Sequence, residues 1–191
     1  MILDLNHTQT ILIDNLINAN TYGEGIVYDG AGNTLPQFSG NTASTGGNAY
    51  NKYISQTITL DEGQDAEDLL VNITAYIPPG AEVDVWVKLL NGEDSDTITQ
   101  RDWIAMEKVY NRTASSLSNR NDFKDYKYSL PVSYMTGPAT VNSPGGEVQY
   151  TNSQGITFTG YKYFQVKIGL RSTNSAIIPR VADLRCIALQ I

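Results

Sequence analysis

Apolar and polar residues alternate along several short stretches of this chain, with the period of two that is typical of half-buried β-strands. The clearest case is Leu69–Ile77, where every second residue is apolar, and Val83–Leu89 repeats the pattern with Asp84, Trp86 and Lys88 on the opposite side. No stretch carries a convincing helical period. Weaker alternation predicts further strands at Tyr53–Leu60, Trp103–Tyr110, Tyr126–Val132, Val148–Thr151, Tyr163–Leu170 and Val181–Ile191.

Strong turn signals separate these stretches. Pro78-Pro79-Gly80 ends the first of them, because proline cannot donate to a strand ladder and glycine allows a reversal. Asn91-Gly92 follows the next one and is a strong hairpin signal. About eight short strands at close spacing are typical of an antiparallel β-sandwich. We therefore expect an all-β chain, a sandwich of jelly-roll type, with a barrel as the less favoured alternative.

The amino-terminal quarter of the chain departs from this pattern. Residues 18–51 are dominated by Gly, Asn, Thr and Ser, and a structureless segment of that length is uncommon in a compact domain unless it is functional or a linker. Its apolar members, among them Tyr28 and Phe38, argue against simple disorder. We divide the chain into an extended arm, residues 1–51, and a sandwich domain, residues 52–191. The arm is expected to order against its own domain or against a neighbouring subunit.

The composition excludes several classes of function. One cysteine, Cys186, and one histidine, His7, leave no material for a disulfide framework, a zinc finger or a Ser-His-Asp triad. No apolar run reaches the roughly 18 residues that a membrane span needs. Acidic stretches at residues 61–68 and 93–96 could offer oxygen ligands to calcium, but they lack EF-hand spacing, and solvated acidic turns are the expectation. We expect no catalytic residue, no cofactor and no enzyme activity.

Charge is distributed unevenly between the two halves of the chain. Residues 1–100 contain 14 acidic and two basic residues, which gives -12, and residues 101–191 contain six acidic and 11 basic residues, which gives +5. No Lys or Arg precedes Lys52, so the arm is unsuited to phosphate, and nucleic acid is not an expected partner. Two explanations remain open: acidic and basic strands interleave within one sheet, or opposite faces meet between copies of a homo-oligomer.

Two tryptophans are candidate contact residues. Trp86 shares a strand face with Asp84 and Lys88, which suggests partial exposure to solvent. It could anchor a protein interface, stack on a sugar ring, or pack beneath a loop or the arm. Trp103, together with Met106, is expected to close one end of the sandwich, because apolar residues after an acidic loop commonly tie that loop to the core.

Three charged residues bracket the last predicted strand: Arg180, Asp183 and Arg185. If they are buried they should be paired, because an unpaired buried charge is strongly destabilising. A local Arg–Asp pair that orients the strand is the favoured interpretation, and a bridge between subunits is the second. Pro179 fixes the backbone just before this strand.

Two segments carry a resemblance to a known kind of protein. One is Val83–Met106, VDVWVKLLNGEDSDTITQRDWIAM, and the other is Phe164–Leu189, FQVKIGLRSTNSAIIPRVADLRCIAL. Together they resemble the β-rich module near the carboxyl ends of virion structural proteins of tailed bacteriophages, especially cyanophages and other contractile-tailed phages. The resemblance covers about residues 52–191. Proteins of this kind carry the module at the end of a much longer chain, whereas here an arm of 51 residues precedes it.

The resemblance implies a non-enzymatic virion structural protein without a cofactor, an assembly or adaptor subunit of the tail, baseplate, neck or fibre-attachment region. Its partners would be other virion proteins and further copies of itself, with no nucleic acid and no membrane, and its location would be the virion. A carbohydrate-binding module or host-receptor-binding domain is the alternative, with a glycan as its ligand. The candidate interface residues are Trp86, Trp103, Tyr28, Phe38, Arg180, Asp183 and Arg185.

Overall fold

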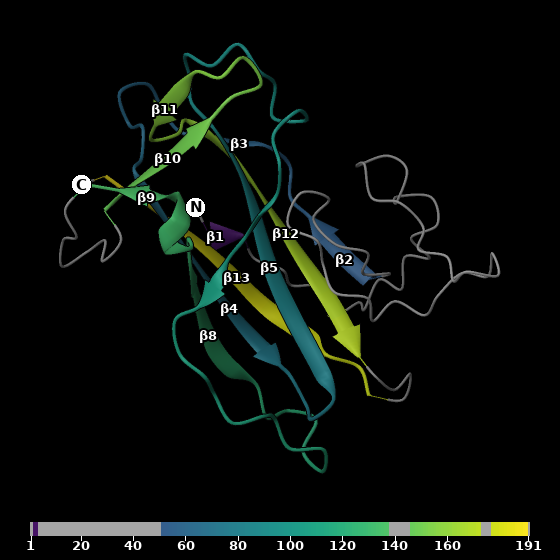
Figure 1. The fold of residues 1–191 in the computed structure, drawn as a ribbon. Helices are drawn as coiled ribbons and strands as arrows, with labels where there is room; N and C mark the ends of the chain where they lie inside the picture. The colour runs from purple at the N-terminus through teal and green to yellow at the C-terminus, as the bar shows by residue number, and fades with distance from the viewer. Residues whose placement is uncertain (1, 4–50, 138–145, 173–176, 191) are drawn as a thin grey trace, which may run out of the picture.

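The computed structural model describes residues 2–3, 51–137, 146–172 and 177–190. These residues form β-strands joined by turns, with one short 3-10 turn at Val132–Tyr134 (Figure 1). The predicted arm, including Tyr28 and Phe38, lies outside the described residues except at its two ends. Within these ranges no helix has the length and apolar character needed to cross a membrane.

The first sheet contains five antiparallel strands in the spatial order β1–β13–β4–β8–β7. Its two central strands are long, and its edges are short. The strands are β1 (Ile2–Leu3), β4 (Asp68–Tyr76), β7 (Glu107–Lys108), β8 (Lys124–Ser129) and β13 (Arg180–Leu189).

The second sheet has the order β2–β12–β5–β6, and β3 also pairs with β12. The longest pairing in the molecule joins β5 to β12, residue by residue from Ala81 opposite Ser172 to Leu90 opposite Tyr163. A small third sheet, β11–β10–β9, lies at one end (Figure 1). The bounds are β2 (Asn51–Ile54), β3 (Ile58–Thr59), β5 (Ala81–Leu90), β6 (Ile104–Ala105), β9 (Met135–Thr136), β10 (Glu147–Thr151), β11 (Thr157–Thr159) and β12 (Tyr163–Ser172).

The strand order is that of a jelly roll. When β1, β2, β4, β5, β6, β8, β12 and β13 are counted from one to eight along the chain, the sheets read 1-8-3-6 and 2-7-4-5. The chain thus crosses repeatedly from one sheet to the other, as it does in the two Greek keys of a jelly roll. The predicted fold class, an antiparallel sandwich of jelly-roll type, is confirmed.

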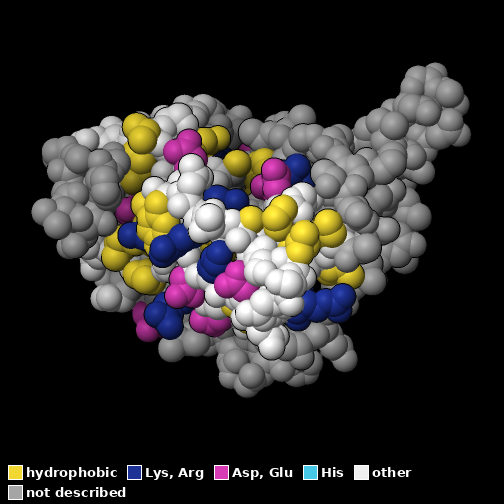
Figure 2. Space-filling model, turned by 90° about the horizontal axis from the view of Figure 1, so that it is seen from below, with side chains coloured by type: hydrophobic (Ala, Val, Ile, Leu, Met, Phe, Trp, Pro, Cys, Tyr) yellow, Lys and Arg dark blue, Asp and Glu magenta, His cyan; other side chains and the backbone are white. Residues whose placement is uncertain are grey.

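This topology also brings strands of opposite charge side by side. In both sheets, strands from residues 1–100 alternate with strands from residues 101–191 at β13–β4–β8 and at β2–β12–β5–β6. Arg171 of β12 pairs with Asp84 of β5 at 2.5 Å and also with Glu82. Acidic and basic strands thus alternate at β13–β4–β8 and at β12–β5, whereas β2 carries only a lysine and β6 carries no charge. Figure 2 shows basic, acidic and hydrophobic side chains mixed on one end of the molecule.

The core lies between the two sheets and consists of the residues that the period of two placed inward. Leu69, Val71, Ile73 and Ala75 of β4 face Val83, Val85, Val87 and Leu89 of β5, and all are buried. Hydrogen bonds cross this core: the Tyr128 hydroxyl donates to the Val83 carbonyl at 3.0 Å, and the Tyr161 hydroxyl donates to the Asp68 carbonyl at 3.0 Å. The two sheets are thus joined by polar atoms as well as by apolar packing.

One predicted strand changes sheet halfway along. The stretch Trp103–Tyr110 contains β6, which pairs with β5 in the second sheet, and β7, which pairs with β8 in the first. Met106 lies at the crossing, where its amide donates to the Val85 carbonyl at 2.9 Å and its side chain enters the core. β9 and β11 were not predicted, because each is too short for an alternating pattern to be visible.

Candidate interaction site

Two lysines and two tryptophans gather on the outward face of the second sheet. Because Val85, Val87, Val166 and Ile168 point into the core, the alternate residues of β5 and β12 point outward. Trp86 is paired with Lys167, and Lys88 is paired with Gln165. Trp103, from the segment before β6, completes the group; we call Trp86, Lys88, Trp103 and Lys167 the lysine–tryptophan cluster.

Each ammonium of the lysine–tryptophan cluster lies over an aromatic ring. The Lys167 Nζ atom is 4.9 Å from the centroid of the Trp86 ring and 4.6 Å from that of Trp103. The Lys88 Nζ atom is 5.0 Å from the centroid of the Trp103 ring and donates a hydrogen bond to the Thr99 carbonyl at 3.2 Å. Tryptophan is the ring that attracts a cation most strongly, and the attraction grows when water is excluded.

Water is largely excluded here. Lys167 is 1% exposed, Trp103 2%, Trp86 4% and Lys88 6%. Burial, with the charge of Lys88 adding to it, lowers the pKa of Lys167 to about 7, and the charge of Asp84 opposes that shift only in part. Burial also lowers the pKa of Lys88, against the opposing charge of Asp102. The charge of Lys88 therefore disfavours the charged form of Lys167.

The loop that places Trp103 is held by two carboxylates. Asp96 accepts hydrogen bonds from the Ser153 amide at 2.9 Å and from the Ser153 hydroxyl at 2.5 Å. Asp94 accepts from the Asn152 amide group at 2.9 Å and from the Tyr150 hydroxyl at 2.9 Å. These contacts, which we call the polar latch, fix residues 91–103 to the β10–β11 hairpin.

Arg101 completes the polar latch. Its guanidinium lies 4.0 Å from the centroid of the Tyr150 ring, 3.5 Å from Asp96 Oδ2, and donates to the Thr151 carbonyl at 3.2 Å. The pKa of Asp96 is lowered, chiefly by the hydrogen bonds from Ser153. Burial raises the pKa of Asp94, but hydrogen bonds from Asp96, Asn152 and Tyr150 outweigh it and lower the pKa overall.

The acidic stretch at residues 93–96 was a candidate for binding calcium. In the structure its two aspartates are already engaged by protein donors in the polar latch. No group of three metal-binding side chains occurs within the ranges that the structure describes. The carboxylates thus hold a loop in place, which is the chemistry that their hydrogen bonds support.

The structure corrects the expected partial exposure of Trp86 and the expected place of Trp103. Trp86 does not face solvent; it is buried beneath Lys167 and beside the loop that carries Trp103, as the third alternative had it. Trp103 does not close the sandwich with Met106: Met106 lies in the core, whereas Trp103 covers the outward face of the second sheet. With ammoniums over their rings, neither tryptophan is available to stack on a sugar in this structure.

The charged residues near β13 lie on the other sheet, apart from the tryptophans. The predicted local Arg–Asp pair was wrong: among the described residues no ion pair joins Asp183 to Arg180 or to Arg185. The Arg180 guanidinium instead lies 4.8 Å from the centroid of the Tyr76 ring and 5.1 Å from that of Phe123, and donates to the Arg120 carbonyl. A shift of register between Val181 and Asp183 separates Arg180 from the rest of the strand.

Sequence reasoning missed Lys167 and undervalued Lys88. The available signal was a lysine inside an otherwise apolar, alternating strand, as in Val166-Lys167-Ile168. Such a lysine occupies the outward face by period alone, and nothing in the local sequence tells whether that face is covered. The cover comes from residues 97–103, which the polar latch directs across β5.

Comparisons with known proteins add no relative to this picture. No family model matches the chain, and neither a curated protein nor a solved structure matches it. What is established is therefore a jelly-roll sandwich with a closed lysine–tryptophan cluster on the outward face of one sheet.

Proposed function

We propose that this chain is a non-enzymatic structural subunit of a tailed-phage virion, an assembly or adaptor part of the tail, baseplate, neck or fibre-attachment region. One observation carries the proposal. The two segments that resemble virion modules, Val83–Met106 and Phe164–Leu189, are distant in the sequence but lie together in space, because β5 and β12 pair along their whole length. The lysine–tryptophan cluster is built entirely from these two segments.

The fold supports the same proposal at a coarser level. Jelly rolls are used by viral capsid subunits, by lectin domains and by cupins, so the fold alone does not select a function. Over the lysine–tryptophan cluster, the outward face of the second sheet is closed by aromatic rings and lysine side chains. A sheet with such a closed face behaves as a rigid block, which suits a part that transmits load within a particle.

The test is whether the chain is a stoichiometric part of particles. Particles purified on a density gradient from the lysate of the virus that encodes this chain are analysed by quantitative mass spectrometry. A fixed copy number per particle, retained after a high-salt wash, is the expected result. A chain that stays in the soluble fraction and binds an array of host glycans would overturn the proposal and favour a carbohydrate-binding module.

A further inference from the structure

The outward face of the first sheet carries its charges in rows that run across the strands. Arg185 of β13 is paired with Asn72 of β4, which is paired with Lys127 of β8. One step along, Asp183 is paired with Thr74, which is paired with Asp125. We call the first set the basic row and the second set the acidic row.

These side chains point outward because their neighbours along each strand point into the core. Leu184 lies between Asp183 and Arg185, Ile73 between the two β4 residues, and Tyr126 between Asp125 and Lys127; all three are buried. Arg185 and Asp125 are exposed, and Asp183 and Lys127 are half-buried. The basic row and the acidic row are therefore open to a partner.

An apolar pair and an aromatic group flank these rows. Beyond the basic row, Ile187, which is 37% exposed, is paired with Leu70. Beyond the acidic row, Arg180 is paired with Tyr76, whose ring contacts Phe123 at 6.2 Å between centroids. The order along the strands is thus apolar, basic, acidic, and then Arg180 lying over the two aromatic rings.

This order is complementary to itself. A twofold axis that lies in the plane of the face, parallel to the rows and midway between the basic and acidic rows, turns the face over and reverses the order of the rows. The basic row of one copy then lies opposite the acidic row of the other, with Arg185 over Asp183 and Lys127 over Asp125. The pair Ile187 and Leu70 comes to lie opposite Arg180 of the second copy and the rings of Tyr76 and Phe123 that it covers.

We propose that two copies of this chain associate through the outward face of the first sheet, about that axis. Within one copy the two charges of each row have the same sign and lie about two strand spacings, roughly 10 Å, apart. The two members of a row therefore repel each other weakly and do not stabilise each other. In the dimer each of the four charges of one copy faces an opposite charge of the other. Dimerisation through this face follows from its surface residues and does not depend on the proposed role in a virion.

The contact is expected to be modest and sensitive to salt. Exposed ion pairs are individually weak. Four such pairs, with only a small apolar area at the edge of the contact, correspond to a transient or assembly-dependent interface rather than an obligate dimer. Raising the salt concentration from about 50 mM to about 500 mM shortens the screening length severalfold and should weaken the dimer by about tenfold or more.

Charge reversal gives a test with an internal check on folding. One variant carries Arg185→Asp with Lys127→Asp, and the other carries Asp183→Lys with Asp125→Lys. Sedimentation velocity of the full chain at low salt and about 0.1 mM is expected to show a dimer for the unmodified protein. Each variant alone should be monomeric, because like charges then face each other across the axis.

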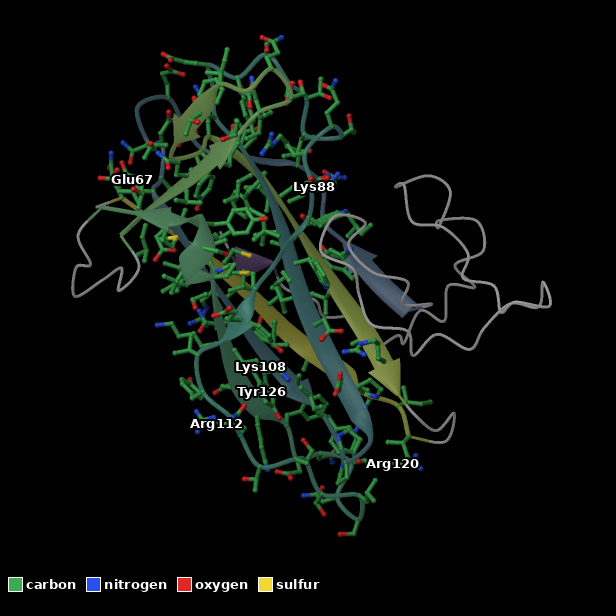
Figure 3. All side chains as sticks on the ribbon, in the orientation of Figure 1. Glu67, Lys88, Lys108, Arg112, Arg120 and Tyr126 are labelled. Carbon is green, nitrogen blue, oxygen red and sulfur yellow. The ribbon has the colours of Figure 1, made fainter. Side chains whose placement is uncertain are left out.

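An equimolar mixture of the two variants should form a heterodimer, since an all-acidic face then meets an all-basic one. The chain that carries all four substitutions should dimerise again, because its rows are exchanged but still complementary. A matched control, Asp61→Lys with Glu93→Lys, reverses two exposed acidic charges in loops outside this face and should leave the dimer intact. Arg120 (Figure 3) is left unchanged, because its carbonyl accepts a hydrogen bond from Arg180, which flanks the rows.

The inference is overturned by any of three results. The unmodified chain stays monomeric at low salt; or both charge-reversed variants still dimerise alone; or the mixture stays monomeric although each variant keeps the circular dichroism spectrum and melting temperature of the folded protein. Misfolded variants would not regain association when mixed, so heterodimer formation in the mixture identifies this face as the interface.

Discussion

At the scale of single residues, stability depends on buried hydroxyls that reach from one sheet to the other. The side chain of Tyr128 comes from β8, crosses the core and donates to the carbonyl of Val83 on β5. It is 1% exposed, and burial raises the pKa of its phenol well above the ordinary value. A buried carbonyl that loses its donor keeps the cost of its desolvation.

We therefore expect Tyr128→Phe to lower the free energy of unfolding by about 1 to 2 kcal/mol, because the ring still fits but the Val83 carbonyl loses its partner. Urea denaturation followed by circular dichroism measures this change. Tyr110→Phe removes an exposed hydroxyl, on a residue that is 42% exposed, and should stay within about 0.5 kcal/mol of the unmodified protein. Equal effects for the two variants would show that the cross-sheet bond contributes little.

The direction of individual side chains was the part of the structure that the sequence predicted best. Period two placed Val83, Val85 and Val87 inward, and all three are buried. It also placed Trp86 on the outward face, which is correct, but the side chain is buried rather than exposed to solvent. Burial on the outward face depends on a loop whose path is set by contacts more than 50 residues away in sequence, between Asp96 and Ser153. Local alternation carries no information about such contacts.

At the scale of elements, the structure differs from the sequence prediction where a strand is interrupted. The stretch predicted as one strand, Tyr53–Leu60, is β2 and β3 separated by residues 55–57. The Ser55 amide donates to the Val166 carbonyl, and the Ser55 hydroxyl accepts from the Val166 amide. Both Tyr53 and Ile58 then pack on the core, although their spacing of five residues is odd. A residue inserted between two strands in this way reverses the alternation, and sequence periodicity alone cannot show it.

The turn before β10 gives the second prediction, which belongs to the scale of elements. Gly146 has a φ of +88°, and a Cβ atom there would lie 2.2 Å from the Thr136 carbonyl oxygen. Gly155, in the β10–β11 turn, has a φ of +80° with nothing within 4 Å. Gly155→Ala should cost about 1 kcal/mol from backbone conformation alone.

Gly146→Ala carries the same conformational cost and adds a collision with backbone, so we expect it to cost at least about twice as much. Chemical denaturation of the two variants in parallel provides the comparison. A Gly146→Ala protein as stable as its Gly155→Ala counterpart would mean that β9 and β10 separate in solution without cost to the rest of the fold.

The polar latch makes a third prediction. Asp96→Asn keeps the shape of the side chain but removes the charge that Ser153 and Arg101 bind, so residues 91–103 should loosen and admit water to Trp103. The expected signs are a red shift of tryptophan emission and faster hydrogen exchange at the Ser153 amide. Asp61→Asn, at an exposed position, is the control and should change neither signal.

Acid should reproduce this change in the unmodified protein. Hydrogen bonds from Ser153 hold the pKa of Asp96 below its ordinary value, so the latch is fully formed above about pH 4 and is lost as the pH falls through the lowered folded value. The red shift is therefore expected only in strongly acidic solution, whereas the Asp96→Asn protein shows it at neutral pH. Identical emission from the two proteins at pH 7 would contradict the latch.

At the scale of the whole molecule, stability should rise toward alkaline pH. The folded pKa of Lys167 is about 7, lowered by burial and by Lys88, against an ordinary value of 10.5. Between these values the unfolded chain binds a proton that the folded chain does not, so the free energy of unfolding increases with pH, by at most about 1.4 kcal/mol per unit. Above about pH 10 the trend reverses, because burial raises the pKa of Tyr128 and Tyr161 in the folded state.

The measurement is a series of urea denaturations from about pH 6 to about pH 10 on the unmodified chain and on Lys167→Met. Methionine keeps an unbranched side chain under the indole of Trp103 but cannot titrate, so its curve should be flatter over this range. The two curves should converge as the pH rises. Parallel curves would show that Lys167 keeps its ordinary pKa in the folded protein.

The strand order shows how much of the whole fold could be predicted from the sequence. The composition and the spacing of strands indicated a jelly-roll sandwich, which is what the strand order shows. The partners of each strand were beyond reach, since β4 pairs with β13 and β5 with β12, across most of the chain. The rows of charge on the first sheet depend on that pairing, and so Arg185 and Lys127 could not be placed together from sequence.

The position of β13 has a consequence for synthesis of the protein. This strand lies between β1 and β4, so the first sheet cannot be completed until residues 180–189 have left the ribosome. Until then β4 has only β8 beside it, and its long apolar edge is open to the same edge on chains emerging from neighbouring ribosomes. The interval between the emergence of β4 and the emergence of β13 therefore sets how long each nascent chain is exposed to wrong pairing.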